Sequence, residues 1–363
     1  MAPSAERDQI VPFAESHRSD VLRLRAPFRG ISPAWNAEHF RWQQEENPWF
    51  EGHQIQLALH DGRVVGMRVL QAAEWEVGGP AIRFRAPCYV GTVIEEGHRS
   101  RGLMSRLSRA IEDQIERSGG RFALNLNAGP VTHIGALAEG WRSLGAFGAS
   151  IRERGGEGFG PLQRATRALR RGLSALLPLP GAGLSLANQP RPEEMAELAA
   201  TTRDPARIRH VKDERWFRWR YRDPSSRYRF AYFRRAGRLV GYMVFHRTAA
   251  PLAAGPLDLA DWERDAELPW TELLGVAVRL ADRWVLPLTA WSAALPEAVR
   301  PGLVRLGFTP RPLWGPLARR RPTFLVGRID RAADQSDRAW EIGPARIDEV
   351  DHWDIRPIYA DPF

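Results

Sequence analysis

The stretch YVGTVIEEGHRSRGLMSRLSRAIEDQIER, residues 89–117, decides how the rest of the chain is interpreted. Its first part, Tyr89 to Ile94, is apolar and rich in β-branched residues, which predicts a buried strand. From Leu103 onward apolar residues recur at helical spacing, which predicts an amphipathic helix. The charged face of that helix is expected to carry Arg106, Arg109, Glu112, Asp113 and Glu116.

The segment between this strand and this helix, HRSRGLM at residues 98–104, has the features of an anion-binding turn. A loop that leads into a helix N-terminus presents unpaired backbone N–H groups and a partial positive charge. Arg99 and Arg101 add full charges, Ser100 adds a hydroxyl, and Gly102 allows a ligand close to the backbone. We predict a phosphate site, although not a Walker loop, which ends in Gly-Lys-Ser/Thr. The alternative is a surface turn with solvated arginines.

The order strand, Arg-x-x-Gly-x-small, helix resembles the acetyl-CoA pyrophosphate loop of the GNAT acyltransferases, Q/R-x-x-G-x-G/A. Residues 99–103 fit this pattern, whereas Met104 stands where the family has Gly or Ala. The resemblance implies that acetyl-CoA binds as a cosubstrate, with its pyrophosphate on the backbone amides of residues 99–104 and its pantetheine beside the strand. The expected cofactor residues are Val93, Ile94, Arg99, Ser100, Arg101, Gly102, Leu103, Met104 and Asn127.

The flanking segments have the element order of the GNAT fold. Residues 55–60 and 63–70 predict a hairpin joined by Asp61-Gly62, and residues 74–77 and 81–85 predict a second hairpin. After the central stretch, residues 121–126 predict a strand, and Thr132 to Leu144 predicts a helix that ends at Gly145.

An internal repeat indicates that the domain is duplicated. FRW at residues 40–42 recurs at 217–219, and GRVVG at 62–66 recurs as GRLVG at 237–241, at nearly the same separation. The predicted fold class is therefore α/β (mixed α+β). We expect two tandem GNAT folds, each a mixed, mostly antiparallel sheet flanked by helices.

The predicted division has four parts. Residues 1–154 form an N-terminal GNAT domain with the acetyl-CoA loop, 155–188 a linker, 189–330 a degenerate C-terminal GNAT domain, and 331–363 a tail. In the second copy the loop expected to match residues 98–104 is acidic, which opposes pyrophosphate binding, so one cofactor per chain is predicted. That loop is expected to offer Asp258, Asp261, Glu263, Asp265 and Glu267.

The linker is predicted to contain a basic amphipathic helix at residues 161–178. Its leucines are expected to pack against the domains, and the alternative is that the helix lies on an anionic membrane. Nucleic acid is not an expected partner, because the chain has no concentrated Lys/Arg run. The oligomeric state is left open.

Composition narrows the class of protein. The chain has 363 residues and a formal net charge of +9, which suits anionic ligands. Its single cysteine, Cys88, excludes an internal disulfide framework and cysteine-ligated metal clusters. No metal is predicted. Because no apolar segment resembles a signal peptide or a membrane span, a cytoplasmic location is expected.

The resemblance implies that an amine attacks the thioester directly, with help from a base and an acid. Glu95 and Glu96 at the end of the strand are candidate bases, and the alternative is a solvated pair. Many family members carry an acidic Tyr where this chain has Trp141, which cannot donate a proton in this role. Tyr89 and His133 are the remaining candidates.

These observations predict an acyl-CoA-dependent N-acetyltransferase whose acceptor is the amine of a small molecule, either an amino sugar or an amino-acid-like compound. One alternative is the related tandem fold that transfers aminoacyl groups from tRNA. The other is a non-catalytic acyl-CoA-binding or regulatory protein, which Met104 and Trp141 favour because they depart from the family pattern.

Overall fold

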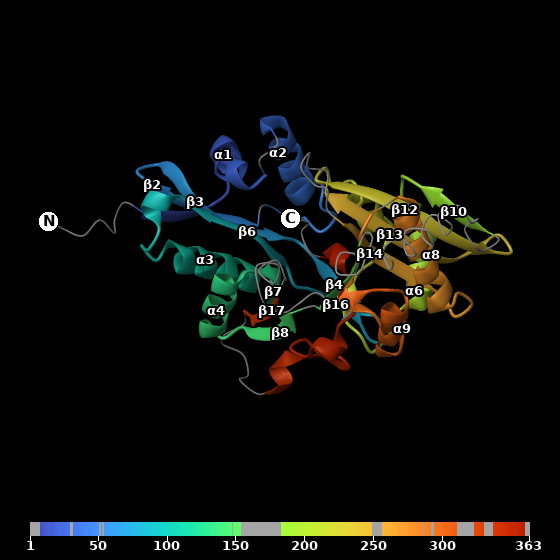
Figure 1. Cartoon of the computed structure of the whole chain (residues 1–363). Helices are drawn as coiled ribbons and strands as arrows, with labels where there is room; N and C mark the ends of the chain where they lie inside the picture. The colour runs from blue at the N-terminus through green and yellow to red at the C-terminus, as the bar shows by residue number, and fades with distance from the viewer. Residues whose placement is uncertain are drawn as a thin grey trace.

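The structure, a computed structural model, describes residues 8–29, 32–50, 52, 54–146, 148–153, 183–248, 256–284, 286–291, 294–310, 323–329 and 337–359. Two seven-stranded sheets lie side by side and form the two lobes of the molecule (Figure 1). The predicted helix at 161–178 lies outside the described residues.

The first sheet carries the segment 89–117. Its strand order is β1-β2-β3-β6-β7-β17-β8, and all pairs are antiparallel except β6 with β7. The strands are β1 (Asp8–Pro12), β2 (Ile55–His60), β3 (Arg63–Gln71), β6 (Cys88–Ile94), β7 (Phe122–Ala128), β17 (Thr323–Arg328) and β8 (Arg142–Ala146).

Helices cover both faces of the first sheet. In Figure 1, α1 (Arg18–Arg29) and α2 (Pro33–Phe40) lie above it, and α3 (Leu103–Arg117) and α4 (Pro130–Ala138) lie below it. A 3-10 turn, η2 (Glu15–His17), precedes α1, and a π-helical turn, η3 (Arg41–Glu45), extends α2. The apolar stripe of α3 is buried against the sheet, as its spacing predicts.

The second sheet has the same arrangement, in the order β10-β12-β13-β14-β15-β9-β16. Its strands are β10 (Leu184–Ala187), β12 (Ser226–Arg235), β13 (Arg238–Thr248), β14 (Leu257–Arg264), β15 (Leu288–Trp291), β9 (Ala149–Arg152) and β16 (Thr309–Pro310). Its helices are α6 (Pro192–Thr202), α7 (Glu214–Arg220), α8 (Trp270–Arg283), η6 (Glu297–Val299) and α9 (Arg300–Arg305). β10 lies within the segment that we assign to the linker, and it forms the edge of this sheet.

The two sheets exchange one strand each. β17, which comes from the second half of the chain, lies between β7 and β8 of the first sheet. In return β9, from the first half, lies between β15 and β16 of the second sheet. Gly327 in β17 leaves room for Trp141, since a Cβ at Gly327 would stand 2.3 Å from the indole ring. Neither sheet is therefore completed by its own half of the chain.

The repeated sequence motifs lie at matching places in the two halves. Trp42 and Trp219, the last residues of the two FRW motifs, stack with ring centroids 5.3 Å apart. Each indole Nε1–H donates to the other residue's carbonyl oxygen, at 2.9 and 2.8 Å. This reciprocal contact is what a local two-fold relation between the copies produces. The two Gly-Arg-x-Val-Gly motifs form the matching turns β2–β3 and β12–β13.

A third, small sheet and the C-terminal segment join the halves. β11 (Arg209–His210) pairs with the hairpin of β4 (Glu74–Val77) and β5 (Ile82–Arg85). The segment 337–359 contains η8 (Asp337–Trp340), β18 (Glu341–Ile342), β19 (Ala345–Arg346), η9 (Val350–His352) and η10 (Pro357–Tyr359). Its apolar side chains join the largest buried cluster, which also takes residues from both halves.

Three expectations from the sequence are wrong. The helix predicted from Thr132 ends at Ala138, because Gly140 has φ 87° and the N–H of Trp141 returns to the carbonyl of Ala136. The residues up to Gly145 form β8 instead. Glu112 is buried on α3 rather than exposed.

The third error concerns the predicted acidic loop of the second copy. Asp258, Asp261 and Glu263 lie in the strand β14, and only Asp265 and Glu267 belong to the turn that follows it. Asp261 and Glu263 are buried in this strand, and a sequence pattern of apolar and acidic residues does not distinguish such a strand from an acidic loop.

Candidate functional site

The parallel strands β6 and β7 separate soon after they meet. Their ladder has one registered pair, Cys88 with Leu124. Beyond this point β6 stays paired with β3 through Ile94, while β7 pairs with β17 on its other side. The two strands therefore form a V that is closed at Cys88 and open toward the end of β6. The facing backbone of β6 is available to pair with an extended ligand.

The loop at the open end of this V has an unusual backbone. After η4 (Glu96–His98), Ser100 has φ 62° and Gly102 has φ 71°, so two of three consecutive residues are left-handed. Gly102 is the N-cap of α3 and supplies no side-chain cap. A Cβ built there meets no atom within 4 Å, so the space before the helix is open. We call residues 99–104 the cradle.

The cradle combines positive charge with exposure. Arg99, Ser100, Arg101 and Met104 are exposed, while Leu103 is buried and anchors the first turn. The Nε of Arg99 donates to the carbonyl of Ile94 at 3.2 Å. Open amides at a helix N-terminus flanked by arginines suit a phosphate or pyrophosphate group. The structure thus brings the predicted cradle residues together.

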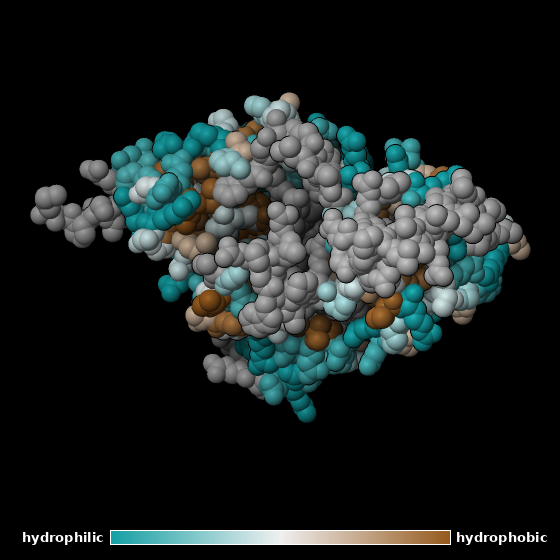
Figure 2. Space-filling view, viewed as in Figure 1, coloured by the Kyte–Doolittle hydropathy of each residue, from teal (hydrophilic) through white to brown (hydrophobic). Residues whose placement is uncertain are grey.

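Two other predicted cofactor residues line the V. Val93 and Ile94 are half-buried on β6, and Asn127 is half-buried near the end of β7. Figure 2 shows hydrophobic surface in the region where Figure 1 places β3 and β6, bordered by hydrophilic surface. An amphipathic chain would therefore meet apolar side chains inside the V and charge at its mouth.

Arg68 is a site residue that sequence reasoning missed. It lies on β3 and is buried, although it carries a charge. Its guanidinium stands 4.1 Å from the ring centroid of Tyr89, and its Nη1 reaches Thr92 Oγ1 at 3.3 Å and Met104 Sδ at 3.0 Å. It therefore links the closed end of the V to the cradle. The available signal was an arginine between the apolar residues Met67 and Val69 in the middle of a predicted strand.

Tyr89 lies next to the closed end of the V. Its ring packs against Trp141 with centroids 5.4 Å apart. Its hydroxyl is buried and has no hydrogen-bond partner among the described residues. Burial raises the pKa of Tyr89, so the hydroxyl keeps its proton at neutral pH. Burial also raises the pKa of the Cys88 thiol to about 12, which leaves it protonated and unreactive.

The other predicted catalytic residues lie toward the open end. Glu95 forms ion pairs with Arg23 and, at 2.8 Å, with Arg63. Glu96 is exposed at the start of η4. His133 is half-buried on α4, which follows β7. The structure does not place these three side chains next to Tyr89.

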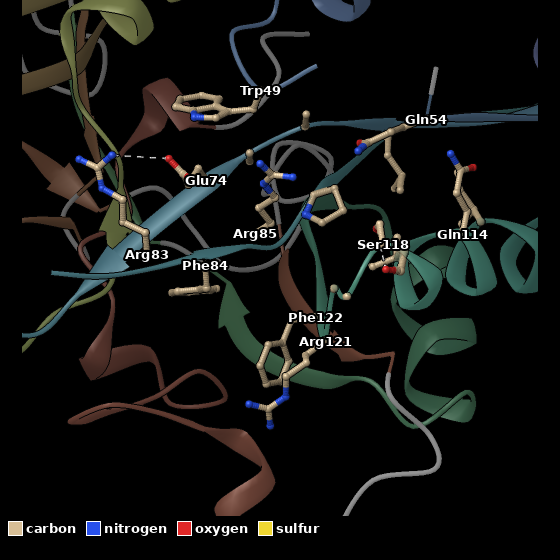
Figure 3. A pocket seen from close by; sticks show the side chains of 18 of the residues that line it. Trp49, Gln54, Glu74, Arg83, Phe84, Arg85, Gln114, Ser118, Arg121 and Phe122 are labelled. Carbon is tan, nitrogen blue, oxygen red and sulfur yellow. Dashed lines mark hydrogen bonds and ion pairs between the residues drawn. The ribbon is translucent and has the colours of Figure 1, made fainter. Parts of the chain in front are cut away.

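A cavity of ≈ 580 Å³ lies beyond the closed end of the V. Pro87 and Phe122, which precede the strand pair Cys88–Leu124, line it, together with the C-terminal end of α3. Figure 3 shows Glu74 and Arg85 at its centre, Trp49 above them and Arg121 below. The cavity thus combines aromatic and apolar walls with charges of both signs.

The described residues also include one group of metal-ligand type, Asp8, His60 and His98. It lies where β1, β2 and η4 meet, outside the V. In the part of the chain that the structure describes, no helix has the length and hydropathy needed to span a membrane.

Comparisons with known proteins agree with this geometry. Residues 28–129 match the family described as acetyltransferase (GNAT) domain. No curated protein sequence matches the chain.

Several solved structures share the fold. A probable N-acyltransferase of unknown function from Enterococcus faecalis V583 aligns with TM-score 0.62 and 9% identity, over 89% of this chain and 73% of the other. Saccharomyces cerevisiae N-myristoyltransferase with bound myristoyl-CoA gives TM-score 0.58 and 13% identity, over 89% and 80%. A tandem GNAT protein from the clavulanic acid biosynthesis pathway gives 0.52 and 15%, over 90% and 100%.

The matched residues contain the V strand β6, the cradle and all of α3. The structural likeness extends over both halves of the chain and includes a protein that is itself a tandem GNAT. Residues 28–129 therefore match the GNAT acetyltransferase domain in sequence, and the two halves of the chain together share the fold of solved GNAT structures, one of them a tandem GNAT protein.

Proposed function

We propose that this protein transfers an acyl group from acyl-CoA to the amine of a small molecule, and that the first copy binds the acyl-CoA. The observation that carries the proposal is the V between β6 and β7, with the uncapped start of α3 at its mouth. The pyrophosphate binds the cradle amides with Arg99 and Arg101. The pantetheine runs along β6 beside Val93 and Ile94, with Asn127 on the opposite strand.

This orientation places the thioester near Tyr89. The strand rises about 3.3 Å per residue, so Glu95 lies roughly 20 Å along the strand from Tyr89. Of the candidate catalytic residues, Tyr89 is thus the one at the reacting end. Glu95, Glu96 and His133 lie at the pyrophosphate end, where Glu95 holds the loop through its two arginines.

The reaction needs few protein groups. The amine nitrogen attacks the thioester carbon, a C–N bond forms, the C–S bond breaks, and the amine proton leaves to water. The Tyr89 hydroxyl, which is buried without a partner among the described residues, donates a hydrogen bond to the thioester oxygen or the departing sulfur. Arg68 adds positive charge beside the negative charge that develops.

Tyr89→Phe tests this role. We expect kcat to fall about 10–100-fold while the Kd for CoA stays unchanged, because only the donor is removed. Thiol release from acetyl-CoA gives the rate, and calorimetry gives the Kd. Tyr228→Phe, at a buried tyrosine of β12, is the control and should leave both unchanged. An unchanged kcat for Tyr89→Phe would contradict the role.

We further propose that the acceptor is amino-acid-like and occupies the cavity of ≈ 580 Å³. Arg83, Arg85 and Arg121 suit a carboxylate, Glu74 suits an amine, and the apolar walls suit a side chain. Trp49 and Gln54 line the cavity, and their Nε1 and Oε1 atoms are buried without a partner among the described residues, so a ligand that reached these atoms on binding would satisfy them.

Paired acceptors test this assignment. Amino acids should support thiol release, the corresponding amines without a carboxylate should do so at least 10-fold less well, and Arg85→Gln should remove the difference. Since a structural neighbour binds myristoyl-CoA, acyl-CoA donors of several chain lengths belong in the same assay. Tight CoA binding with no thiol release for any amine would favour a non-catalytic acyl-CoA-binding protein instead.

A further inference from the structure

Three side chains from separate parts of the chain converge at the edge of the first sheet. Asp8 is on β1, His60 ends β2, and His98 ends η4. One donor atom from each residue lies within 4.8 Å of the other two. The rings of His60 and His98 meet at 63° with centroids 4.7 Å apart. We propose that these residues form a binding site for a divalent transition metal of the zinc type.

The donor set fits such an ion. Two imidazoles and one carboxylate are ligands that zinc, cobalt and nickel accept, and three protein ligands leave one position for water. Around a tetrahedral zinc ion with bonds of about 2.0–2.1 Å, ligand atoms are about 3.3 Å apart. Binding would replace the hydrogen bond of 2.6 Å between His60 Nδ1 and Asp8 Oδ1, so these two atoms would separate, and a change in the side-chain torsions of His98 would bring its ring closer to them.

The surroundings of His60 also fit. Its Nδ1 faces Asp8 Oδ1 at 2.6 Å, while its Nε2 points to Asp61 Oδ2 at 3.6 Å. A histidine that binds a metal with one ring nitrogen usually donates a hydrogen bond from the other N–H to a carboxylate, and this bond orients the ring. Asp61 is placed to do this from the β2–β3 turn.

A simple hydrogen-bonded pair does not account for the third residue. The Nδ1 of His98 is buried and has no hydrogen-bond partner among the described residues. Asp8 is itself only 9% exposed. A buried imidazole nitrogen without a partner is unfavourable, and a metal ion bound to that nitrogen would satisfy it.

The position of the site suggests what the metal does. His98 is the residue directly before Arg99, the first residue of the cradle. A metal held by His98, Asp8 and His60 would fix the loop to β1 and β2, and the cradle amides would then be ordered before the cofactor arrives. Preorganisation of this kind raises affinity because less conformational entropy is lost on binding. The metal site itself does not depend on the proposed function.

The test is a titration of the full-length protein, treated with a chelator and dialysed, with Zn²⁺ and with Co²⁺. We expect one equivalent to bind with a micromolar or lower Kd, and Co²⁺ to give the absorption of a four-coordinate site. His98→Ala should weaken binding at least 10-fold. His17→Gln, at a histidine in η2, is the matched control and should bind as the wild type does.

A second, more conservative variant distinguishes loss of the metal site from misfolding of the protein. Asp61 has φ 50°, a conformation that asparagine also tolerates, so Asp61→Asn keeps the turn and removes the carboxylate. It should weaken metal binding about 10-fold. Absence of binding to the wild type, or equal binding to His98→Ala, would overturn the proposal. Metal should also lower the Kd for CoA in the wild type and not in His98→Ala, and an equal effect in both would refute the link to the cradle.

Discussion

The starts of α3 and α8 are equivalent places in the two copies, and they are built differently. Before α3 the chain is exposed, left-handed at Ser100 and Gly102, and flanked by two arginines. Before α8 the N-cap is Pro269, and the preceding turn is closed by its own contacts. Leu268 is buried in this turn and lies so close to Gly241 that a Cβ there would stand 2.2 Å from its side chain.

The charged residues of the turns before α3 and α8 differ in whether they have partners within the protein. In the second copy Asp265 and Glu267 are paired with Arg238 of β13, at 2.8 and 2.7 Å, so their negative charges are balanced within the protein. In the first copy Arg101 precedes an open N-terminus. The two helix starts therefore differ in exposure and in charge pairing, as we expect if only the first copy binds a phosphate group.

The buried acidic residues of β14 in the second copy are also paired within the protein. Asp261 is fully buried and accepts hydrogen bonds from Lys212 Nζ at 2.5 Å, Tyr221 at 3.0 Å and Tyr242 at 3.1 Å. Glu263, two residues on, also pairs with Lys212, at 3.1 Å. Because Lys212 is completely buried, this network is inaccessible to a ligand and acts as structure.

The largest effect should follow from breaking this network. We expect Lys212→Met to lower the free energy of unfolding by about 3–5 kcal/mol, since it leaves buried carboxylates without their closest cation. Denaturant titration measures the loss. The affinity of the folded variant for CoA should not change, because the network lies in the copy without a cradle.

Arg218 provides the matched control for this prediction. It lies on the exposed face of α7 and pairs with Glu214 of the same helix and with Glu193 of α6, where solvent screens the charges. Arg218→Met should leave the unfolding transition where it is. A loss for Lys212→Met no greater than that for Arg218→Met would mean that the buried network does not hold the second copy together.

The next effect concerns the cradle. Gly102→Asp adds a side chain where φ is 71° and a negative charge where pyrophosphate is expected, so CoA affinity should fall at least 100-fold. Calorimetry measures the Kd, and the unfolding transition shows that the protein is folded.

Gly237→Asp is the control for this prediction. It changes the glycine of the β12–β13 turn, which also has a positive φ of 80° but is far from the cradle in sequence. It should leave CoA binding intact, and equal losses in both variants would remove the distinction between the copies.

How much the sequence could predict differs between local and long-range features. The strand β6 (apart from its first residue, Cys88), the turn at Gly102 and the start of the helix α3 at Leu103 were predicted, because each depends on residues close in sequence. The strand β8 was missed because its partner β17 comes from the other half of the chain. The exchange of β9 and β17 has no local signal, since either strand could also pair within its own half.

The site was predictable to a similar extent. The cradle follows a loop pattern that is contiguous in sequence, so residues 99–104 were found together. Arg68 was missed because its role depends on the register of β3 against β6, which brings it over Tyr89. The acidic residues of β14 were misinterpreted because their partners, Lys212 and Arg356, come from distant segments.

The smallest expected effect, that of Arg99→Ala on CoA affinity, tests most directly whether the two helix starts differ in function. Arg99 reaches the carbonyl of Ile94 with its Nε, which leaves the guanidinium beside the cradle at the end of the V. One charge-assisted hydrogen bond to a phosphate contributes about 1.5–3 kcal/mol, less at an exposed position. Arg99→Ala should therefore weaken CoA binding about 10-fold without changing the stoichiometry of one CoA per chain.

If the second copy bound CoA as well, the titration would show two sites, and only one of them would respond to Arg99→Ala. Glu267→Ala, which removes a carboxylate from the matching turn of the second copy, should change neither the Kd nor the stoichiometry. A second site, or a response to Glu267→Ala, would show that the acidic turn before α8 is also a ligand site and that the two helix starts do not differ in function.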